Sequence, residues 1–452
     1  MTCVDTSSFT TVVGRPVPCG RFTMAAAEES YEGVQGGCFT AMAETARFYR
    51  CVLYFMSGGN YKQCPYFAGR LQARVQCYSL ALIFFLWSKP HYRNKSFQED
   101  MVKNLRNVAI PGTGIPLSLY CSLKATVYFF ILVINPVLCL IAAINAQRKY
   151  SRPWVQAYTE QLLCPKDWFS FWRLNCRLAS YHALVTRSEG YCQEDKWTFL
   201  RDGKGKGVPI SPFLDIPAVV IKDKNEEGGM GLFFFKNATE GGNWIIQERL
   251  DNDHFVSSLL PDNAPLSTMR VISASRQGRY YVQWWLEQRQ GKIPGPDCIE
   301  TLSCVFRAGR QGADTDHSSV LFDVDASSGT ILKGTTNAHW YELGPTKFLN
   351  TPWVSTHNTT HHPDNNKLVT GAVVPDMKAK LTLVADAHFK LLPDVPLVGW
   401  DVALTTKGVC LLEVNLSCNF FRGSFSLPNY VRFVHDYLVA LEEEREKPVK
   451  GD

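Results

Sequence analysis

The distribution of hydrophobic positions divides the chain into three parts. Residues 1–37 are rich in Thr, Ser, Gly and Ala without a period, which predicts a flexible leader. Residues 38–149 have mainly helical spacing and contain the longest apolar runs. Beyond a predicted helical linker at 150–194, residues 195–452 mix strand-length and helix-length patterns, which predicts an α+β domain.

The longest uncharged apolar stretch covers residues 125–146. About 20 apolar residues are enough for a helix to cross the hydrocarbon core of a bilayer. We therefore expect a membrane segment here, preceded by a shorter apolar run at 77–87. Asn135-Pro136 predicts a kink in this segment, because proline cannot donate a helix-interior hydrogen bond. A helix buried beneath the C-terminal domain is the alternative interpretation.

Apolar residues continue at helical spacing after this stretch. The apolar stripe of the 150–194 segment is typical of a side that faces a core. Residues 378–392 and 429–446 predict two further helices, the first packed near the hairpin described next.

Two mainly apolar runs, 400–404 and 411–415, flank a turn-forming Lys-Gly pair and predict a β-hairpin. Asp401 lies on its first strand. Glu413 and Asn415 are two positions apart on the second strand, so their side chains point to the same face. Three oxygen-bearing side chains thus converge on an otherwise apolar hairpin, as a Mg²⁺ site requires. A polar face on an edge hairpin is the alternative.

A second chemical signal lies around a glycine-rich turn. Residues 218–222 predict a buried strand that ends in a lysine, Lys222, and the turn that follows contains Gly228, Gly229 and Gly231. A lysine can place a positive charge against a phosphate, and glycines let backbone N–H groups approach phosphate oxygens. Strands are predicted after the turn as well, the last at residues 244–248. The pattern is neither a P-loop nor a Rossmann fingerprint.

Composition excludes several classes of function. The chain has 452 residues, of which 46% are hydrophobic and 20% charged, with a net charge of +5. This mild, evenly spread excess does not indicate a nucleic-acid partner. The 15 cysteines include no Cys-x-x-Cys pair, which argues against a zinc site or disulfide framework and favours a reducing compartment. His357, His361 and His362 cluster among turn-forming residues and predict an exposed polar turn rather than a metal site.

In this order, the parts resemble an ATP-grasp domain, in which two α+β lobes clamp ATP. Asp195-Lys196 opens a helix, and residues 207–212 are similar to the connection into the small nucleotide lobe. Residues 218–222 resemble the lysine-bearing strand, 228–231 the phosphate loop and 247–250 the hinge that contacts adenine. The resemblance assigns nucleotide binding to Lys196 (or Arg201), Lys222, Gly228, Gly229, Gly231, Gln247, Glu248, Arg249 and Leu250.

Shorter motifs are similar to those of the sugar-transfer associated branch, which is named for its genomic neighbourhood. They are residues 267–271, 306–310, Asp316-His317, 323–329, His362-Pro363-Asp364 and 398–401. Ser318-Ser319 departs from this pattern, since the branch usually carries glycines there. The resemblance covers residues 163–441.

The resemblance implies a ligase that uses ATP and Mg²⁺, in glycan or natural-product modification. A substrate carboxylate attacks the γ-phosphate, and an amine, or less often a thiol or hydroxyl, then displaces phosphate from the acyl-phosphate. The implied metal ligands are Asp401, Glu413 and Asn415. Arg270 and Arg307 would hold the γ-phosphate or the carboxylate, because their planar fork matches either group, although surface ion pairs are an alternative. His317 would contact the acceptor substrate or cap a turn.

Two other functions remain open: a membrane-tethered nucleotide-binding scaffold without turnover, and a kinase that phosphorylates a hydroxyl. The expected partners are a small carboxylate, a small amine and a membrane bound through residues 125–146. Arg148, Lys149 and Arg152 follow that stretch and favour membrane association with the catalytic domain facing the cytosol. A soluble cytoplasmic protein is the alternative.

Overall fold

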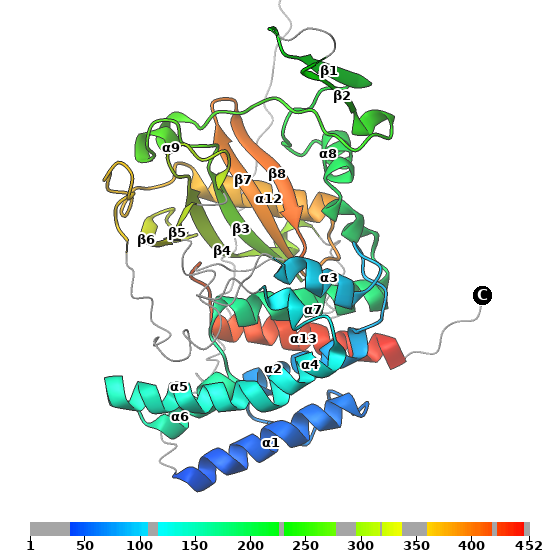
Figure 1. Ribbon diagram of the computed structural model, residues 1–452, viewed down its shortest axis with the longest axis vertical. Coiled ribbons are helices and arrows are strands. Elements are labelled where there is room, and N and C mark those ends of the chain that lie inside the picture. Colours follow the sequence, from blue (N-terminus) through cyan, green and yellow to red (C-terminus); the bar gives the residue numbers. More distant parts are fainter. Residues whose placement is uncertain are drawn as a thin grey trace, which may run out of the picture.

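The computed structural model describes residues 37–106, 116–225, 230–276, 295–316, 319–336, 359–417 and 423–446. These residues form an α+β protein in which a six-stranded sheet stands above a stack of helices (Figure 1), which confirms the expected class. Gly228, Gly229, His317 and His357 lie outside the described residues, as does the expected leader apart from residue 37.

The large sheet is antiparallel throughout, with the strand order β6-β5-β4-β3-β7-β8. Its strands are β3 (Thr268–Ser275), β4 (Ile299–Ala308), β5 (Val320–Val324), β6 (Ile331–Thr336), β7 (Leu397–Thr405) and β8 (Gly408–Asn415). The expected C-terminal hairpin is therefore present as β7 and β8. Gly408 begins β8 with a φ of +107°, a conformation that costs glycine little because it has no Cβ.

The helices α12 (Met377–Leu391) and α8 (Lys196–Gly205) share a hydrophobic core with the sheet. Trp400 is fully buried there, and its Nε1 donates a 2.8 Å hydrogen bond to the Ser273 hydroxyl. The same hydroxyl lies 2.7 Å from Nδ1 of His388 on α12. The expected helix at 378–392 is thus confirmed, and it covers the face of the sheet opposite the side chain of Asp401.

Buried histidines, among them His182 and His388, make the stability of this fold depend on pH. Burial lowers the pKa of His182 to about 3 and that of His388 to about 4. The unfolded chain takes up these protons near pH 6.5, whereas the native state stays neutral to lower pH. Below pH 6.5 each histidine therefore costs up to about 1.4 kcal/mol of stability per pH unit, until its native pKa is reached.

We expect the free energy of unfolding, measured by urea denaturation, to fall steeply between pH 6.5 and pH 5. His388→Asn should make this dependence shallower, whereas His361→Asn, at an exposed histidine, should leave it unchanged. A slope in His388→Asn equal to that of the parent protein would contradict the assignment.

The helical part lies below the sheet in Figure 1. Its α-helices are α1 (Cys38–Met56), α2 (Leu71–Leu86), α3 (Phe97–Leu105), α4 (Lys124–Phe129), α5 (Asn135–Tyr150), α6 (Trp154–Leu163), α7 (Trp168–Thr186) and α13 (Leu427–Glu446). A further short helix, α9 (His254–Leu259), precedes β3, and the 3₁₀ turns are η1 (Leu117–Leu119), η3 (Glu189–Glu194), η4 (Ala238–Glu240) and η5 (Pro296–Cys298). The segment expected as a helical linker is helical: it forms α6, α7 and η3, and residues of α6 and α7 belong to the core described next.

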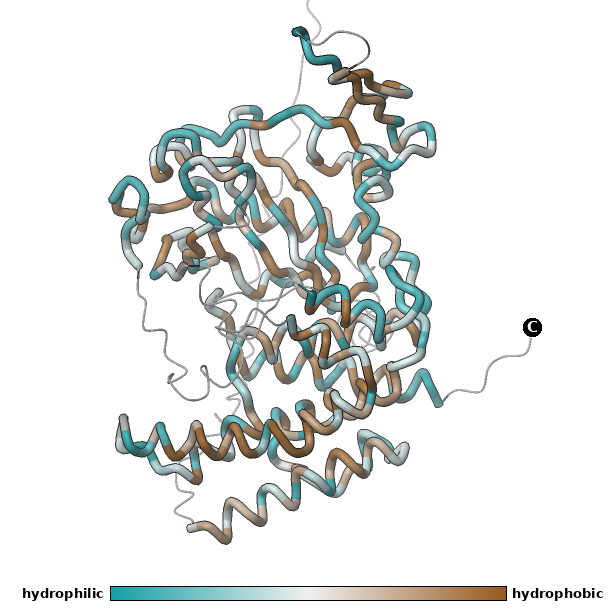
Figure 2. Tube along the Cα trace, viewed as in Figure 1, coloured by the Kyte–Doolittle hydropathy of each residue, from teal (hydrophilic) through white to brown (hydrophobic). Residues whose placement is uncertain are grey.

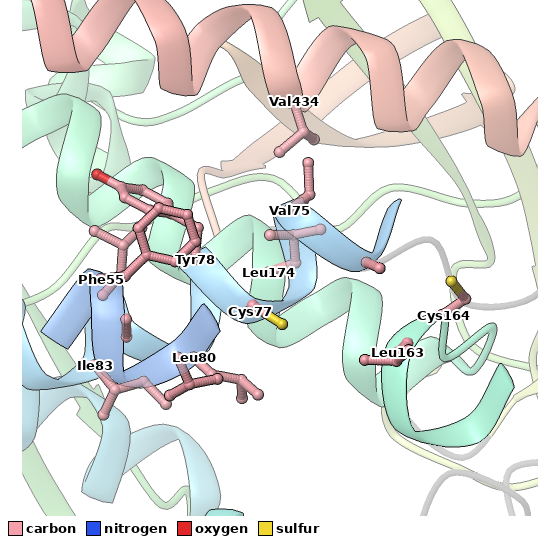
Figure 3. Close-up of a cluster of buried hydrophobic side chains, with 14 of the residues drawn as sticks. Phe55, Val75, Cys77, Tyr78, Leu80, Ile83, Leu163, Cys164, Leu174 and Val434 are labelled. Carbon is pink, nitrogen blue, oxygen red and sulfur yellow. The ribbon is translucent and has the colours of Figure 1, made fainter. Parts of the chain in front are cut away.

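One hydrophobic core joins the N-terminal helices to the last helix of the chain. Figure 3 shows its centre, where Tyr78 of α2 lies beside Phe55 of α1, and Val434 of α13 points toward Val75 of α2. All four side chains are buried. The helical region and α13 are therefore packed together rather than joined by the linker alone.

Residues 124–148 form one helix that is long and apolar enough to cross a membrane, and 39% of its most apolar window is buried against the protein. The irregularity expected at Pro136 is a π-helical segment, η2 (Phe130–Ile134), between α4 and α5. In a regular helix the carbonyl of Leu132 would accept from residue 136, which has no N–H. The hydroxyl of Tyr49 donates to that carbonyl instead, at 2.5 Å.

A separate two-stranded sheet, β1 (Ala218–Lys222) and β2 (Leu232–Lys236), stands apart from the large sheet (Figure 1). The prediction that 218–222 is buried was wrong: Val220 and Ile221 are 47% and 52% exposed. A short apolar run has the same pattern whether or not anything packs on the strand, so burial could not be inferred from it. The strand expected at 244–248 is reduced to isolated bridges at Trp244 and Gln247.

Candidate active site

The register of the large sheet brings polar side chains from four strands to the face opposite α12. Arg270 of β3 pairs with Asp401 of β7, Asp401 with Glu413 of β8, and Gly399 with Asn415. Residues paired across strands share a face. The alternation of residues therefore predicted correctly that Asp401, Glu413 and Asn415 lie on one side of the hairpin.

Two arginines hold Asp401 at the centre of this face. Nε of Arg270 donates to one carboxylate oxygen of Asp401 at 2.5 Å, and Nη2 of Arg307 donates to the other at 2.9 Å. The side chain of Asp401 is 6% exposed and that of Arg270 is 8% exposed. The two arginines are therefore partners in a buried charge network, which excludes the surface ion pairs considered from the sequence.

A second carboxylate, Asp316, joins the network through Arg307 and Thr268. Nε of Arg307 lies 3.1 Å from Asp316 and 2.7 Å from the Thr268 hydroxyl, which itself donates to Asp316 at 2.6 Å. Asp316 immediately precedes His317, for which the resemblance implies contact with the acceptor substrate or a turn-capping role. The described residues thus bring the position next to His317 into the arginine cluster.

The pKa values of the two carboxylates in this network are shifted in opposite directions. Burial alone would raise the pKa of Asp401, but the charges of Arg270 and Arg307 outweigh it and hold that pKa below its usual value. Burial raises the pKa of Asp316, and the charge of Arg307 offsets this only in part. Asp401 is therefore a permanent anion at neutral pH, whereas Asp316 takes up a proton more readily than an ordinary aspartate.

Glu413 pairs with Lys196, the first residue of α8, at 2.7 Å between Oε2 and Nζ. Asp195 caps this helix by accepting from the backbone N–H of Thr198 at 2.8 Å, which fixes the helix start beside β8. Of the two cations considered from the sequence, the structure brings Lys196 to the hairpin. Arg201 instead lies 3.0 Å from Asp202 on the exposed side of α8.

The donor set fits Mg²⁺ held jointly by the protein and a phosphate ligand. In the described residues no group of three or more His, Cys, Asp or Glu side chains is placed to hold a metal ion. Mg²⁺, however, usually takes only one or two carboxylates and completes its shell with phosphate and water. Of the three ligands implied by the resemblance, Asp401 is instead held by the two arginines, and Glu413 supplies one carboxylate. Asn415 is half-buried, and its Nδ2 has no hydrogen-bond partner among the described residues, so a rotation of the amide would present its oxygen to a cation.

The residues that the sequence predicts to bind the nucleotide lie in two separate parts of the structure. Lys222 is exposed at the end of β1, and in the described part of the chain no hydrogen bond or ion pair joins it to Glu413. Gly231 has a φ of +64° at the start of β2, as the glycine-rich turn requires.

The expected hinge segment lies against the β7–β8 turn. Gln247 bridges to Phe213, Arg249 is exposed, and Leu250 is buried with Ala403 and Cys410. Glu248 forms an ion pair with Lys407 in the turn.

The His-Pro-Asp turn is less exposed than the sequence predicted. His362 is fully buried, and its Nε2 lies 3.0 Å from the carbonyl of Gly309 at the end of β4. Asp364 accepts two hydrogen bonds from Nε and Nη2 of Arg310, and this pairing lowers its pKa to about 2. The prediction of an exposed turn was wrong for His362, because its partner lies more than 50 positions away and local composition carries no sign of it.

Sequence reasoning missed an ion-pair chain that anchors the end of β8. Oε2 of Glu194 accepts from the backbone N–H of Leu416 at 2.9 Å, directly after Asn415. Arg93 bridges Glu194 and the buried Asp100 of α3, with both contacts at 2.6 Å. These residues lie in separate parts of the sequence, and no local motif links them.

Residues 346–422 match the family model described as sugar-transfer associated ATP-grasp. Neither the comparison with curated proteins nor that with solved structures gives a match. The matched segment is shorter than the 163–441 resemblance, but it includes the strand that bears Asp401 and the strand that bears Glu413 and Asn415.

Proposed function

We propose that the protein is an ATP- and Mg²⁺-dependent ligase, since residues 346–422 match the sugar-transfer associated ATP-grasp family model. It would join a carboxylate to an amine, or less often to a thiol or hydroxyl, through an acyl-phosphate. The family match indicates ATP-dependent ligase-type activity in general. The reaction, the two substrates and the roles of individual residues are our inference.

The observation that carries this proposal is the pair of buried guanidinium groups beside Glu413. Both donate to Asp401, and Arg307 also pairs with Asp316, so buried carboxylates fix the orientation of the two guanidinium groups. An incoming γ-phosphate or substrate carboxylate would bind beside these groups, in a site with little competing water. Bringing a carboxylate and a phosphate together by such contacts is the main source of rate in phosphoryl transfer.

Asp401 and Glu413 have different roles in the proposed reaction. Asp401 keeps both arginines oriented, and Glu413 with Asn415 would hold Mg²⁺, which neutralises phosphate charge when bound. In the structure, Nζ of Lys196 lies 2.7 Å from Oε2 of Glu413. Lys196 would exchange this contact for a nucleotide phosphate as the metal binds, so that neither charge is left alone.

The small sheet of β1 and β2 would act as the second lobe of the clamp. Its exposed apolar residues, Val220, Ile221, Phe233 and Phe234, have no cover in the described part of the chain. Closure over a nucleotide would bury part of this surface and bring Lys222 toward the phosphates. The free energy gained by burying apolar area favours such closure.

A nucleotide-binding scaffold without turnover is the second candidate. It is favoured by the fact that Asp401, Asp316 and Glu413 each already have a cationic partner. Product analysis separates the alternatives. Release of ADP and phosphate that requires both a carboxylate and an amine indicates a ligase, a phosphorylated product without free phosphate indicates a kinase, and ATP binding without turnover indicates a scaffold.

Lys222→Ala should weaken Mg-ATP binding by about tenfold or more, because it removes a charged contact to phosphate. Since Lys222 is exposed, its loss should leave the melting temperature unchanged. Isothermal titration with Mg-ATP measures the affinity. Lys224→Ala, at another exposed lysine in the same turn, is the matched control. Equal affinities in the parent protein and Lys222→Ala would remove this lysine from the site.

We also propose that the helix of residues 124–148 holds the protein at a membrane, through the stretch expected at 125–146. Its length and apolar composition support this, and no further helix in the described residues is both long and apolar enough to span a bilayer.

A further inference from the structure

Two arginines on successive turns of α7 are buried and form no ion pair with any of the described residues. Arg173 is 3% exposed and Arg177 is 9% exposed. Nη1 of Arg177 donates to the Ser79 hydroxyl at 2.7 Å, but in the part of the chain that the structure describes its Nε has no hydrogen-bond partner. Within the same residues Nη2 of Arg173 has none either, and its Nη1 donates to the Cys176 sulfur at 3.7 Å.

No carboxylate within the described residues forms an ion pair with either arginine. Asp100 acts on Arg173 electrostatically, but its oxygens are already taken by Arg93, Asn94 and Asn104. Burial, followed by the charge of Arg173, lowers the pKa of Arg177. Two like charges buried together are costly, and proteins normally compensate them with an anion.

These arginines lie beside the start of the apolar helix. The charges of both act on Cys121, and that of Arg177 acts on Tyr128 of α4. The hydroxyl of Tyr128 in turn donates to the carbonyl of Leu80 at 3.3 Å, which ties α4 to the helix that carries Ser79. The unpaired charges are therefore close to the residues at which the 124–148 helix begins.

Hydrophobic residues follow one another along this helix (Figure 2), and several of their side chains form an exposed stripe. Its members are Phe129, Phe130, Val133, Val137, Leu140, Ile141 and Ile144. Their spacing of three or four residues places them on one side of the helix, while Ile131, Cys139 and Ala143 on the other side are buried. A helix packed on one side and apolar on the other is typical of a protein embedded in the surface of a bilayer.

We propose that Arg173 and Arg177 bind the phosphate group of an anionic membrane phospholipid whose acyl chains lie along this stripe. Guanidinium forks match phosphate oxygens, and Arg173 Nη2 and Arg177 Nε supply donors that have no hydrogen-bond partner among the described residues. The stripe supplies apolar contact that free phosphate could not use. Charge and hydrophobic surface thus favour a lipid over an inorganic anion.

The test uses flotation of the full chain with vesicles of phosphatidylcholine, with and without phosphatidic acid. We expect phosphatidic acid to strengthen binding, and the double variant Arg173→Met/Arg177→Met to lose about tenfold or more of that gain. Lys204→Gln/Lys206→Gln is the matched control: it also removes two positive charges, both exposed and outside the apolar helix. It should reduce binding by less than about twofold, as loss of exposed charges does.

Inorganic phosphate and a folding control complete the experiment. Because the variant removes unpaired buried charges, its melting temperature in the absence of lipid should equal or exceed that of the parent protein. The proposal fails if phosphate alone raises the melting temperature of the parent protein while vesicles show no preference for phosphatidic acid. It also fails if a folded double variant keeps the full preference. A double variant that does not fold is replaced by Arg177→Lys, which keeps one charge, loses the fork and should lose most of the preference.

Discussion

Asp401→Ala should lower the free energy of unfolding by about 3–5 kcal/mol, because it leaves the buried guanidinium groups of Arg270 and Arg307 without their shared carboxylate. Urea denaturation followed by tryptophan fluorescence measures this loss, and buried Trp400 makes fluorescence sensitive to the sheet. The effect should persist at high salt, since buried pairs are screened little.

The matched control for Asp401→Ala is Glu300→Ala, which removes the carboxylate of an exposed pair with Arg276. Exposed pairs contribute about 0–1 kcal/mol, and salt screens them. A loss in Asp401→Ala as small as that in Glu300→Ala would mean that the two arginines find other partners. The buried network would then not be the element that orders this face of the sheet.

The second large effect is expected at Glu413. Glu413→Gln keeps the shape of the side chain but removes the charge proposed to hold Mg²⁺, so ATP turnover should fall by at least about 100-fold. The fold should be retained, because Glu413 is only partly buried and its pair with Lys196 is accessible to water. Release of ADP and phosphate over a panel of carboxylates and amines measures the turnover.

Glu240→Gln, at a 3₁₀ turn distant from the large sheet, controls for the change in net charge and should keep full turnover. Full activity in Glu413→Gln would exclude the metal role. If Glu413→Gln loses turnover and its melting temperature also falls sharply, Glu413 is needed for folding. The loss of its ion pair with Lys196 would then explain the loss of turnover.

Local alternation was enough to predict the hairpin that carries the acidic residues. A strand has a side-chain period of two, so the faces of Asp401, Glu413 and Asn415 follow once β7 and β8 are recognised. The two arginine strands were assigned by resemblance, and the register then brought Arg270 opposite Asp401. This part of the site depends on sheet geometry that the sequence encodes locally.

The remaining contacts depend on residues that are distant in sequence. The link of Lys196 to Glu413 and that of His362 to Gly309 have no local signature. The burial of β1 was misjudged because its apolar run does not reveal what packs on it. Helix α12, in contrast, was predicted correctly. Apolar residues recur over several of its turns at helical spacing, and this spacing indicates a side that is buried.

Isothermal titration of ATP into the full chain, with Mg²⁺ and again with EDTA, shows directly whether Glu413 and Asn415 bind a magnesium nucleotide. Binding should be at least about tenfold tighter with Mg²⁺, because these two side chains contribute through the metal. Glu413→Gln should abolish this difference. ATP binding of equal strength with and without Mg²⁺, or no binding in either condition, would contradict this role of the two side chains.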